Sequence, residues 1–429
     1  MDLIAKMENN CPAPVNIAIG SKRLIMYGNA KEMKMKKQHI IINIFFTVLL
    51  LYLIAPWFFE KQFFFNELLS AFGCATLIYK RRSIPTDNIS LAIIFLLLLG
   101  GVHAIASLFR MDELYYYLRN TVIVYSIFGY FAGYFTWRYL FPYIEKIRLP
   151  LAAYSVTGIA LRAPKLLVER FGMSALFPVL FYDVAGKYIL PLLIASNVVY
   201  AIAYDSSTTM ILSAFYLFVW IVPGYRFFVI AVVAGLIVFS IFFWKMIPNL
   251  SLISQHYNHF NERGIRSVVN SNRILAIDPN STWRLILWKQ SIVDKFPENI
   301  PGIGFGTPMY KYYPIEDHRK IPQLPYVMGA HNSFVYVFAR LGIGFVAAIG
   351  IIYHEVMRSY FRMKRYAGER KELLLFYSFF AVTFIAVFNP ALESPIYAVG
   401  YWTILGLLSA AIQHVKKEIP EFHESPVYT

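Results

Sequence analysis

Two side chains in the polar part of the chain are suited to chemistry on a phosphorylated substrate, His331 and Arg284. An imidazole can accept a proton from a hydroxyl near neutral pH, so His331 could act as a general base. The guanidinium of Arg284 offers a planar fork of donors that matches phosphate oxygens. Each also has a structural interpretation, because His331 could anchor a helix at a membrane interface and Arg284 could reach from an interfacial helix into water.

The neighbouring residues would position these two side chains. Asn332 is of a type favoured as a helix N-cap, and Trp288 lies in an amphipathic stretch suited to a membrane interface. Residues 302–306 read Gly-Ile-Gly-Phe-Gly, and no βαβ pattern surrounds them. Gly304 and Gly306 therefore indicate a tight turn or a close approach to a ligand, rather than a dinucleotide site.

Two further charged residues lie in or beside apolar runs. Arg340 follows His331 along the same predicted helix, where a charge needs a partner or a polar cavity. It could form an ion pair with Glu393 or line a phosphate cavity, whereas Glu393 itself is expected to face water. We expect no metal, since no standard ligand spacing occurs among the loop histidines, which are His256, His259 and His318.

Composition identifies the class of protein that must position these residues. The chain has 429 residues, of which 58% are hydrophobic and 15% charged, and its mean hydropathy is +0.51. This is more apolar surface than a soluble core can bury, so we expect an all-α, polytopic membrane protein. The net charge of +15 lies largely in short loops between apolar runs, which favours a topology signal and contact with membrane lipids over nucleic-acid binding.

The apolar runs divide the chain into five parts. We expect a basic cytoplasmic tail at 1–38, nine transmembrane helices within 39–246, one large periplasmic loop at 247–330, three more transmembrane helices within 331–412 and a cytoplasmic tail at 413–429. The predicted spans are 40–59, 62–79, 89–109, 120–137, 149–161, 173–185, 187–204, 207–222, 225–246, 331–353, 372–388 and 396–412. Short helices and turns are expected within the loop.

The number of spans depends on residues 149–186. Their two apolar runs are short, and charged residues including Arg162 and Arg170 separate them. Either both runs cross the membrane or neither does, which gives twelve or ten spans. We favour twelve, which places both arginines on the outer face. The basic residues that follow the span at 331–353 mark the cytoplasmic side, so the loop at 247–330 is expected outside.

The chain resembles the O-antigen ligase/polymerase family of bacterial envelope proteins in four motifs, which are Arg284-x-x-x-Trp288, Pro301-Gly302-x-Gly304-x-Gly306, Ala330-His331-Asn332-x-Phe334 and Leu341-Gly342-x-Gly344. The resemblance implies a GT-C-like glycosyltransferase of the bacterial inner membrane with its active site on the periplasmic side. Its donor would be an undecaprenyl-diphosphate-linked glycan. The acceptor is the lipid A core in ligases and a lipid-linked glycan in polymerases.

The resemblance also implies roles for single residues. His331 takes the position of the catalytic base and Arg284 that of an arginine that holds the diphosphate, with neither a metal nor a nucleotide cofactor. Many relatives carry a Ser-Arg pair where this chain reads Asp205-Ser206-Ser207-Thr208-Thr209. Arg162 or Arg170 could replace that missing arginine, or the diphosphate could be held differently. A transporter or flippase for the same lipid-linked sugars is the alternative, and it would be expected to show paired halves.

Overall fold

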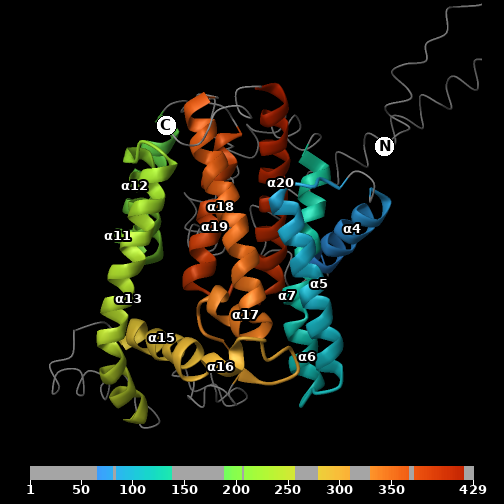
Figure 1. The fold of residues 1–429 in the computed structure, drawn as a ribbon. Helices are drawn as coiled ribbons and strands as arrows, with labels where there is room; N and C mark the ends of the chain where they lie inside the picture. The colour runs from blue at the N-terminus through green and yellow to red at the C-terminus, as the bar shows by residue number, and fades with distance from the viewer. Residues whose placement is uncertain are drawn as a thin grey trace, which may run out of the picture. The chain divides into compact units, whose positions relative to one another are not determined.

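The computed structural model describes residues 65–80, 84–137, 188–204, 207–256, 279–309, 329–366 and 372–419. All of them belong to the second of the two compact units into which the chain divides, Leu51–Thr429. The described residues form helices and connecting turns without any strand (Figure 1). The predicted spans at 40–59, 149–161 and 173–185 lie outside the described residues, as do Arg162 and Arg170.

Most of the described helices lie on apolar runs of the sequence. In chain order they are α4 (Phe65–Tyr79), α5 (Asn88–Leu108), α6 (Leu114–Asn120), α7 (Val122–Tyr125), the 3-10 turn η2 (Ser126–Phe128), α11 (Ile189–Tyr204), α12 (Ser207–Ile221), α13 (Tyr225–His256), α15 (Pro279–Lys289), the π-helical turn η5 (Gln290–Asp294), α16 (Phe296–Asn299), α17 (Ser333–Leu341), α18 (Ile343–Tyr366), α19 (Leu373–Phe388) and α20 (Pro395–Glu418). After η2 the chain stays helical to residue 137.

Three of the described helices are long and apolar enough to cross a membrane. They contain the segments Asn88–Leu108 of α5, Tyr225–Lys245 of α13 and Tyr397–Glu418 of α20. Two shorter apolar helices span Thr208–Ile221 and Leu373–Phe388. About 20 apolar residues are needed to cross about 30 Å of hydrocarbon. The length and composition of these helices therefore confirm the expectation of an all-α membrane protein.

The helices differ in how much of their apolar surface is buried. The apolar part of α13 is almost entirely exposed, whereas that of α20 is almost entirely buried. Small residues bring α20 close to the helix after η2, since a Cβ on Gly129 would lie 2.8 Å from Val399 O. The Tyr130 hydroxyl adds polar contacts there, at 2.9 Å from Ser409 Oγ and 2.7 Å from Ser90 Oγ. Because of this packing, α20 is a central helix of the described bundle.

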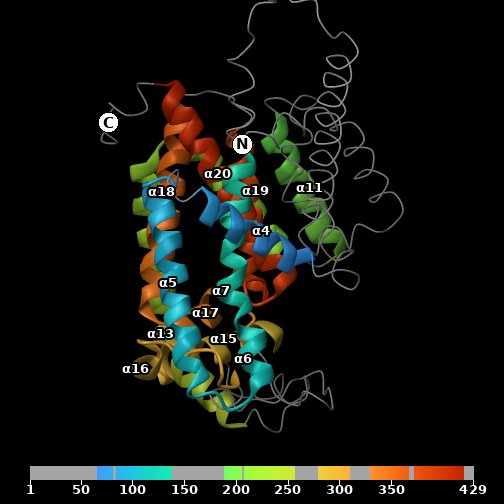
Figure 2. The same ribbon diagram turned by 90° about the vertical axis from the view of Figure 1, so that its right-hand side faces the viewer.

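The helices α5 and α18 pack against each other in opposite directions (Figure 2). At the start of α5, the side chain of Asn88 donates a hydrogen bond to Glu355 of α18. We call this the basic end, because Arg358 and Lys416 also lie there, around one pocket. At the other end of α5, Ser107 contacts residues 304–305, and we call this the loop end.

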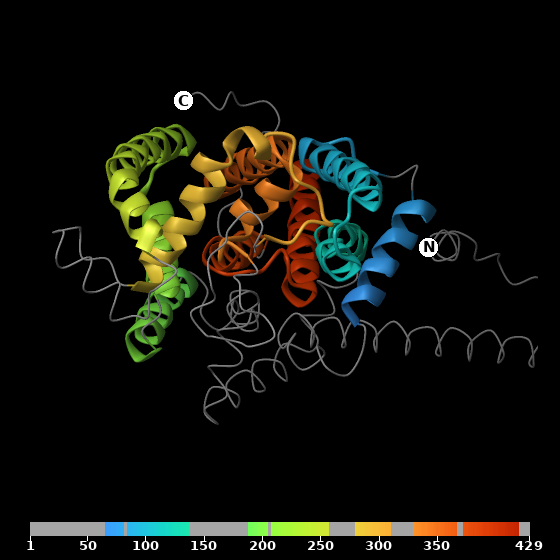
Figure 3. The ribbon, with the colours of Figure 1, turned by 90° about the horizontal axis from the view of Figure 1, so that it is seen from below.

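The polar segment after α13 folds against the loop end. The helix α15 contacts α13, and the segment formed by η5 and α16 contacts α17 (Figure 3). The expectation of short helices in this segment agrees with α15, η5 and α16. The apolar segment before it ends at Lys245, beside the predicted end of the span at 246, and α13 continues as a helix to His256.

The predicted single span at 331–353 is two helices in the structure. Gly342 ends α17 with a φ of 73°, a left-handed conformation that L side chains rarely adopt. The amide of the next residue, Ile343, donates to Ile300 O at 2.9 Å instead of continuing the ladder of α17. A Cβ at Gly342 would overlap that same carbonyl oxygen. The break therefore lets residues 300–304 pack against the junction of α17 and α18.

Candidate functional site

The start of α17 is fixed by a side-chain cap. Asn332 has extended backbone angles, and its Oδ1 accepts hydrogen bonds from Phe334 N at 3.0 Å and Val335 N at 3.1 Å. These are two of the amides that a helix leaves without backbone partners at its first turn. Asn332 is thus the N-cap of α17, and its carboxamide oxygen is used within the protein rather than on a ligand.

The residue before this cap, His331, has an unusual backbone. Its φ is 48°, and among the described residues it is the single non-glycine residue with a positive φ. For an L-residue this conformation costs about 1–2 kcal/mol, and such strain is concentrated at functional sites. The backbone on either side of it is held, because Trp288 Nε1 donates to Ala330 O at 2.9 Å and Asn332 caps the helix. This fixed backbone sets the direction in which the half-buried imidazole projects from the chain.

The helix α15 carries two more of the predicted site residues, Arg284 for the diphosphate and Trp288 for positioning. Arg284 and Trp288 lie one turn apart on this helix, so they project from the same side. Arg284 Nη1 donates to Phe388 O at 3.1 Å, at the carboxyl end of α19, where a positive charge is stabilised by the helix dipole. The Arg284 and Trp288 bonds tie α15 to the end of α19 and to the start of α17. Arg284 and His331 are thereby held on adjoining elements.

A turn between α19 and α20 folds back onto the start of α17. The hydroxyl Oγ of Ser333 accepts hydrogen bonds from Ala391 N at 2.7 Å and Leu392 N at 3.0 Å. The same oxygen lies 2.6 Å from Glu393 Oε2 and 3.0 Å from Asn389 O, either of which can accept its proton. The expectation that Glu393 faces water was wrong, since its exposed fraction is 7%. Ser333 satisfies two backbone amides of the turn and bonds the Glu393 carboxyl. The turn can therefore pack with Glu393 buried.

The Glu393 carboxyl is electrostatically unusual. Burial raises its pKa to about 7, against the lowering effects of the Ser333 hydrogen bond and of the positive charges on Arg119 and Arg340. Its Oε1 is buried and has no hydrogen-bond partner among the described residues. A carboxyl group with a pKa near neutrality and a buried oxygen without a partner can take part in proton transfer. Glu393 therefore joins the candidate site.

Arg340 has a different role from either role predicted for it. The side chain is completely buried, and Nη1 donates to Gly304 O at 3.0 Å and Thr307 O at 2.6 Å. The other terminal nitrogen, Nη2, donates to Tyr336 Oη at 3.2 Å. Arg340 forms no ion pair with Glu393 in the described residues and lines no phosphate cavity there. Its charge instead holds the glycine-rich loop, and it acts on Glu393 only at longer range.

The glycines of this loop let it approach the protein's own helices. Gly302 and Gly304 have φ values of 85° and 75°. A Cβ on Gly302 would lie 2.6 Å from Arg340 O, and one on Gly306 would lie 2.5 Å from Met111 Cα. Of the two alternatives left by the sequence, the structure shows the tight turn, and the close approach is to α17 and to the end of α5. These glycines therefore let the loop pack against α17, the helix that follows His331.

A buried polar network that the sequence analysis missed completes this support. Asn120 Nδ2 donates to Phe305 O at 2.7 Å, and Tyr336 Oη donates to Asn120 Oδ1 at 2.6 Å. Phe305 N donates to Ser107 Oγ at 2.9 Å. The contact between Tyr336 and Arg340 could have been predicted, because the two residues are four apart and so lie on one face of the helix. No sequence signal connects Asn120 or Ser107 to a loop nearly 200 residues away.

Together these contacts place one imidazole, one guanidinium and one carboxyl group on three segments that meet at the loop end. The arrangement is suited to proton transfer beside an arginine, a residue type that can bind anions. Among the described residues, no group of histidine, cysteine, aspartate and glutamate side chains could hold a metal ion. Arg162 and Arg170 lie outside the described residues, so the structure does not place a second arginine. Comparison of the chain with protein-family models, curated proteins and solved structures finds no match.

Proposed function

We propose that the protein is a metal-independent, inverting membrane glycosyltransferase of the O-antigen ligase or polymerase type. It transfers an undecaprenyl-diphosphate-linked glycan to an acceptor hydroxyl of the lipid A core or of another lipid-linked glycan. The observation that carries this proposal is the strained backbone of His331 at the start of α17, beside the helix that carries Arg284. A GT-C-like architecture with twelve spans belongs to the same proposal.

In this mechanism His331 acts on the acceptor and Arg284 on the donor. His331 removes the proton of the acceptor hydroxyl as its oxygen attacks the anomeric carbon of the donor glycan. The bond from that carbon to the diphosphate oxygen breaks, and undecaprenyl diphosphate leaves with the bonding electrons. Arg284 stabilises the negative charge that develops on the leaving diphosphate. A single displacement inverts the anomeric centre, and the lipid diphosphate needs no metal in order to leave.

Glu393 and Arg162 or Arg170 complete the proposal. The Glu393 carboxyl is bonded to Ser333, two residues after His331, so it can influence the proton affinity of the site and position its backbone. One of the two arginines from 149–186 would bind the second phosphate of the donor, replacing the arginine that many relatives carry after the serine of their Ser-Arg pair. This role requires that both runs of 149–186 cross the membrane.

The arrangement of charge supports a site on the periplasmic face of a bacterial inner membrane. Arg358 and Lys416 lie at the basic end, whereas His331 and Arg284 lie at the loop end. Basic residues are retained on the cytoplasmic side of membrane proteins. If the basic end is cytoplasmic, the loop end faces the periplasm, where lipid-linked glycans meet their acceptors in this class of enzyme.

The proposal is tested by replacing His331 with alanine in cells that lack the wild-type gene and analysing their surface glycans. Loss of glycan-capped lipid A core with accumulation of lipid-linked polymer indicates a ligase. Single repeats without long chains indicate a polymerase. His354→Ala, at the basic end, is the matched control and should leave the glycans unchanged. Unchanged glycans in His331→Ala cells would reject the proposal.

A further inference from the structure

A polar pocket of about 230 Å³ lies at the basic end, between α5, α18 and α20. Its polar lining includes Asp87, Asn88, Glu355, Arg358, Gln413 and Lys416. The proposed transfer reaction does not use this pocket, because His331 and Arg284 are at the other end of the helices. Its volume is below the range typical of sites for drug-sized molecules and is suited to a small polar group.

The charges of this pocket are balanced. Two carboxylates, Asp87 and Glu355, and two cations, Arg358 and Lys416, are among the described lining residues. Asp87 is already used, because its Oδ1 caps α5 through Ile89 N at 3.0 Å and its Oδ2 lies 3.0 Å from Ser90 Oγ. A ligand with only negative charge would meet both carboxylates, so the lining favours a ligand that carries both signs of charge.

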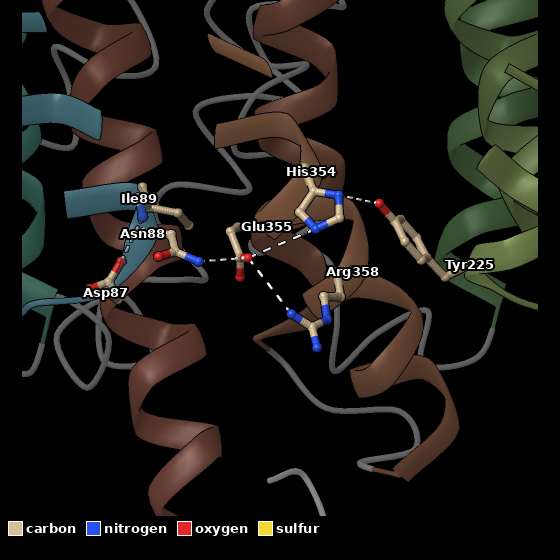
Figure 4. Close-up of polar contacts among 7 residues, drawn as sticks. All are labelled: Asp87, Asn88, Ile89, Tyr225, His354, Glu355 and Arg358. Carbon is tan, nitrogen blue, oxygen red and sulfur yellow. Dashed lines mark hydrogen bonds and ion pairs between the residues drawn. The ribbon is translucent and has the colours of Figure 1, made fainter. Parts of the chain in front are cut away.

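Glu355 and Arg358 present their opposite charges to the same space (Figure 4). Glu355 Oε1 accepts a hydrogen bond from Asn88 Nδ2 at 2.9 Å, whereas Arg358 Nη1 is 3.8 Å away and His354 Nε2 4.0 Å away. A separation of 3.8 Å is an ion pair without a hydrogen bond. The Arg358 side chain is 36% exposed, so its donors can also reach a ligand. His354 is turned toward α13, where its Nδ1 lies 2.6 Å from Tyr225 Oη.

The position of the pocket along the helices points to a lipid. Asn88 is the first residue of α5, and Lys416 is in the last turn of α20. Both helices are long enough to span a membrane, so their ends lie at the depth of lipid headgroups. From Asn88 along α5, Leu91, Phe95 and Leu98 are exposed. Their spacing puts them on one face of the helix, where an acyl chain can lie.

We propose that this pocket binds the headgroup of a zwitterionic phospholipid of the phosphatidylethanolamine type. The phosphate binds to Arg358 and Lys416, the ammonium group binds to Glu355, and one acyl chain follows the exposed face of α5. A charge-assisted contact to each end of the headgroup distinguishes this lipid from an anionic one. The site is independent of the transfer reaction, so either proposal can fail alone.

The experiment is native mass spectrometry of the full-length protein in detergent, with phosphatidylethanolamine or phosphatidylglycerol of equal chain length, or with soluble phosphoethanolamine. The wild type should retain phosphatidylethanolamine in preference to the other two ligands. Arg358→Gln should weaken its binding by about tenfold, the loss expected for one charge-assisted contact. Arg365→Gln, an exposed arginine on the same helix, should leave the binding unchanged.

A second variant and a second readout keep the test decisive. Glu355→Gln removes the negative charge, so it should shift the preference toward phosphatidylglycerol. Phosphatidylethanolamine should raise the thermal unfolding temperature of the wild type and of Arg365→Gln equally, and that of Arg358→Gln by less at the same lipid concentration. Equal binding of the two lipids by the wild type, equal loss in Arg358→Gln and Arg365→Gln, or preference for soluble phosphoethanolamine would each overturn the proposal.

Discussion

Replacing Tyr336 with phenylalanine tests whether the buried polar network holds the loop end together. The substitution removes one oxygen atom and keeps the ring that lies 5.1 Å from the Arg340 guanidinium carbon. That oxygen donates to Asn120 Oδ1 at 2.6 Å and accepts from Arg340 Nη2 at 3.2 Å. The variant therefore leaves a buried amide oxygen and one N–H of a completely buried guanidinium without this partner.

The expected loss in the free energy of unfolding follows from these two polar groups, each of which loses a hydrogen-bond partner. A buried polar group that loses its partner costs about 1–3 kcal/mol, with more for a charged group. Tyr336→Phe should therefore lower the free energy of unfolding by about 2–4 kcal/mol. The matched control is Tyr216→Phe, which removes one buried hydroxyl that donates to Tyr377 O at 2.7 Å. That carbonyl lies within α19, where the helix ladder supplies a donor, so the control should cost about 1 kcal/mol.

The assay is unfolding of both purified variants in one mild detergent, followed by tryptophan fluorescence. Transfer activity is measured in parallel, because Tyr336→Phe should also loosen the loop that Arg340 holds. We expect Tyr336→Phe to be less stable than Tyr216→Phe and to lose more activity. Equal stability of the two variants would refute the reasoning that the network carries more than one ordinary hydrogen bond.

Three further predictions concern the same end of the molecule. The folded-state pKa of Glu393 is raised from 4.5 to about 7, so the folded protein binds more protons than the unfolded chain between these values. Its free energy of unfolding should therefore fall by about 3 kcal/mol as pH rises from about 4.5 to 7. Glu393→Gln should remove the contribution of this group to the pH dependence of the free energy of unfolding, measured across this range. Gly342→Ala should lower the free energy of unfolding by about 2–4 kcal/mol, whereas Gly350→Ala, where a Cβ meets nothing within 4 Å, should not lower it. His331→Gly should be more stable than His331→Ala by about 1 kcal/mol, since glycine relieves the positive φ while both variants lose the imidazole; equal stability of the two would contradict backbone strain at this position.

The long apolar helices could be predicted because each depends on a local property, the length of an apolar run. Residues 88–108 and 373–388 are helical within one residue of the predicted ends, 89–109 and 372–388. The break at Gly342 could not be read from the sequence, because it depends on the carbonyl of Ile300, which belongs to a loop 42 residues earlier. A glycine in an apolar run does not show which backbone will approach it.

The candidate site was predictable in its residue types but not in its contacts. The sequence predicts His331 and Arg284 from what their side chains can do, and the structure places them on adjoining elements. The sequence predicts that Glu393 faces water, because a polar turn after an apolar helix is usually exposed. Its burial depends on the hydroxyl of Ser333, 60 residues earlier. The sequence predicts that Arg340 pairs with an acid or lines a phosphate cavity, whereas its partners are the Tyr336 hydroxyl and two backbone carbonyls. Backbone carbonyls carry no sequence signature.

The central claim is tested most directly by glycan transfer in a purified system. The full-length protein is reconstituted in liposomes with an undecaprenyl-diphosphate-linked glycan and with either acceptor, and both the glycosylated product and the released undecaprenyl diphosphate are measured. The wild type should release one lipid diphosphate for each glycan transferred, and His331→Gln should reduce the rate by about 100-fold or more, as expected for loss of a general base. Full activity of His331→Gln, or no release of undecaprenyl diphosphate by the wild type with either acceptor, would contradict the account.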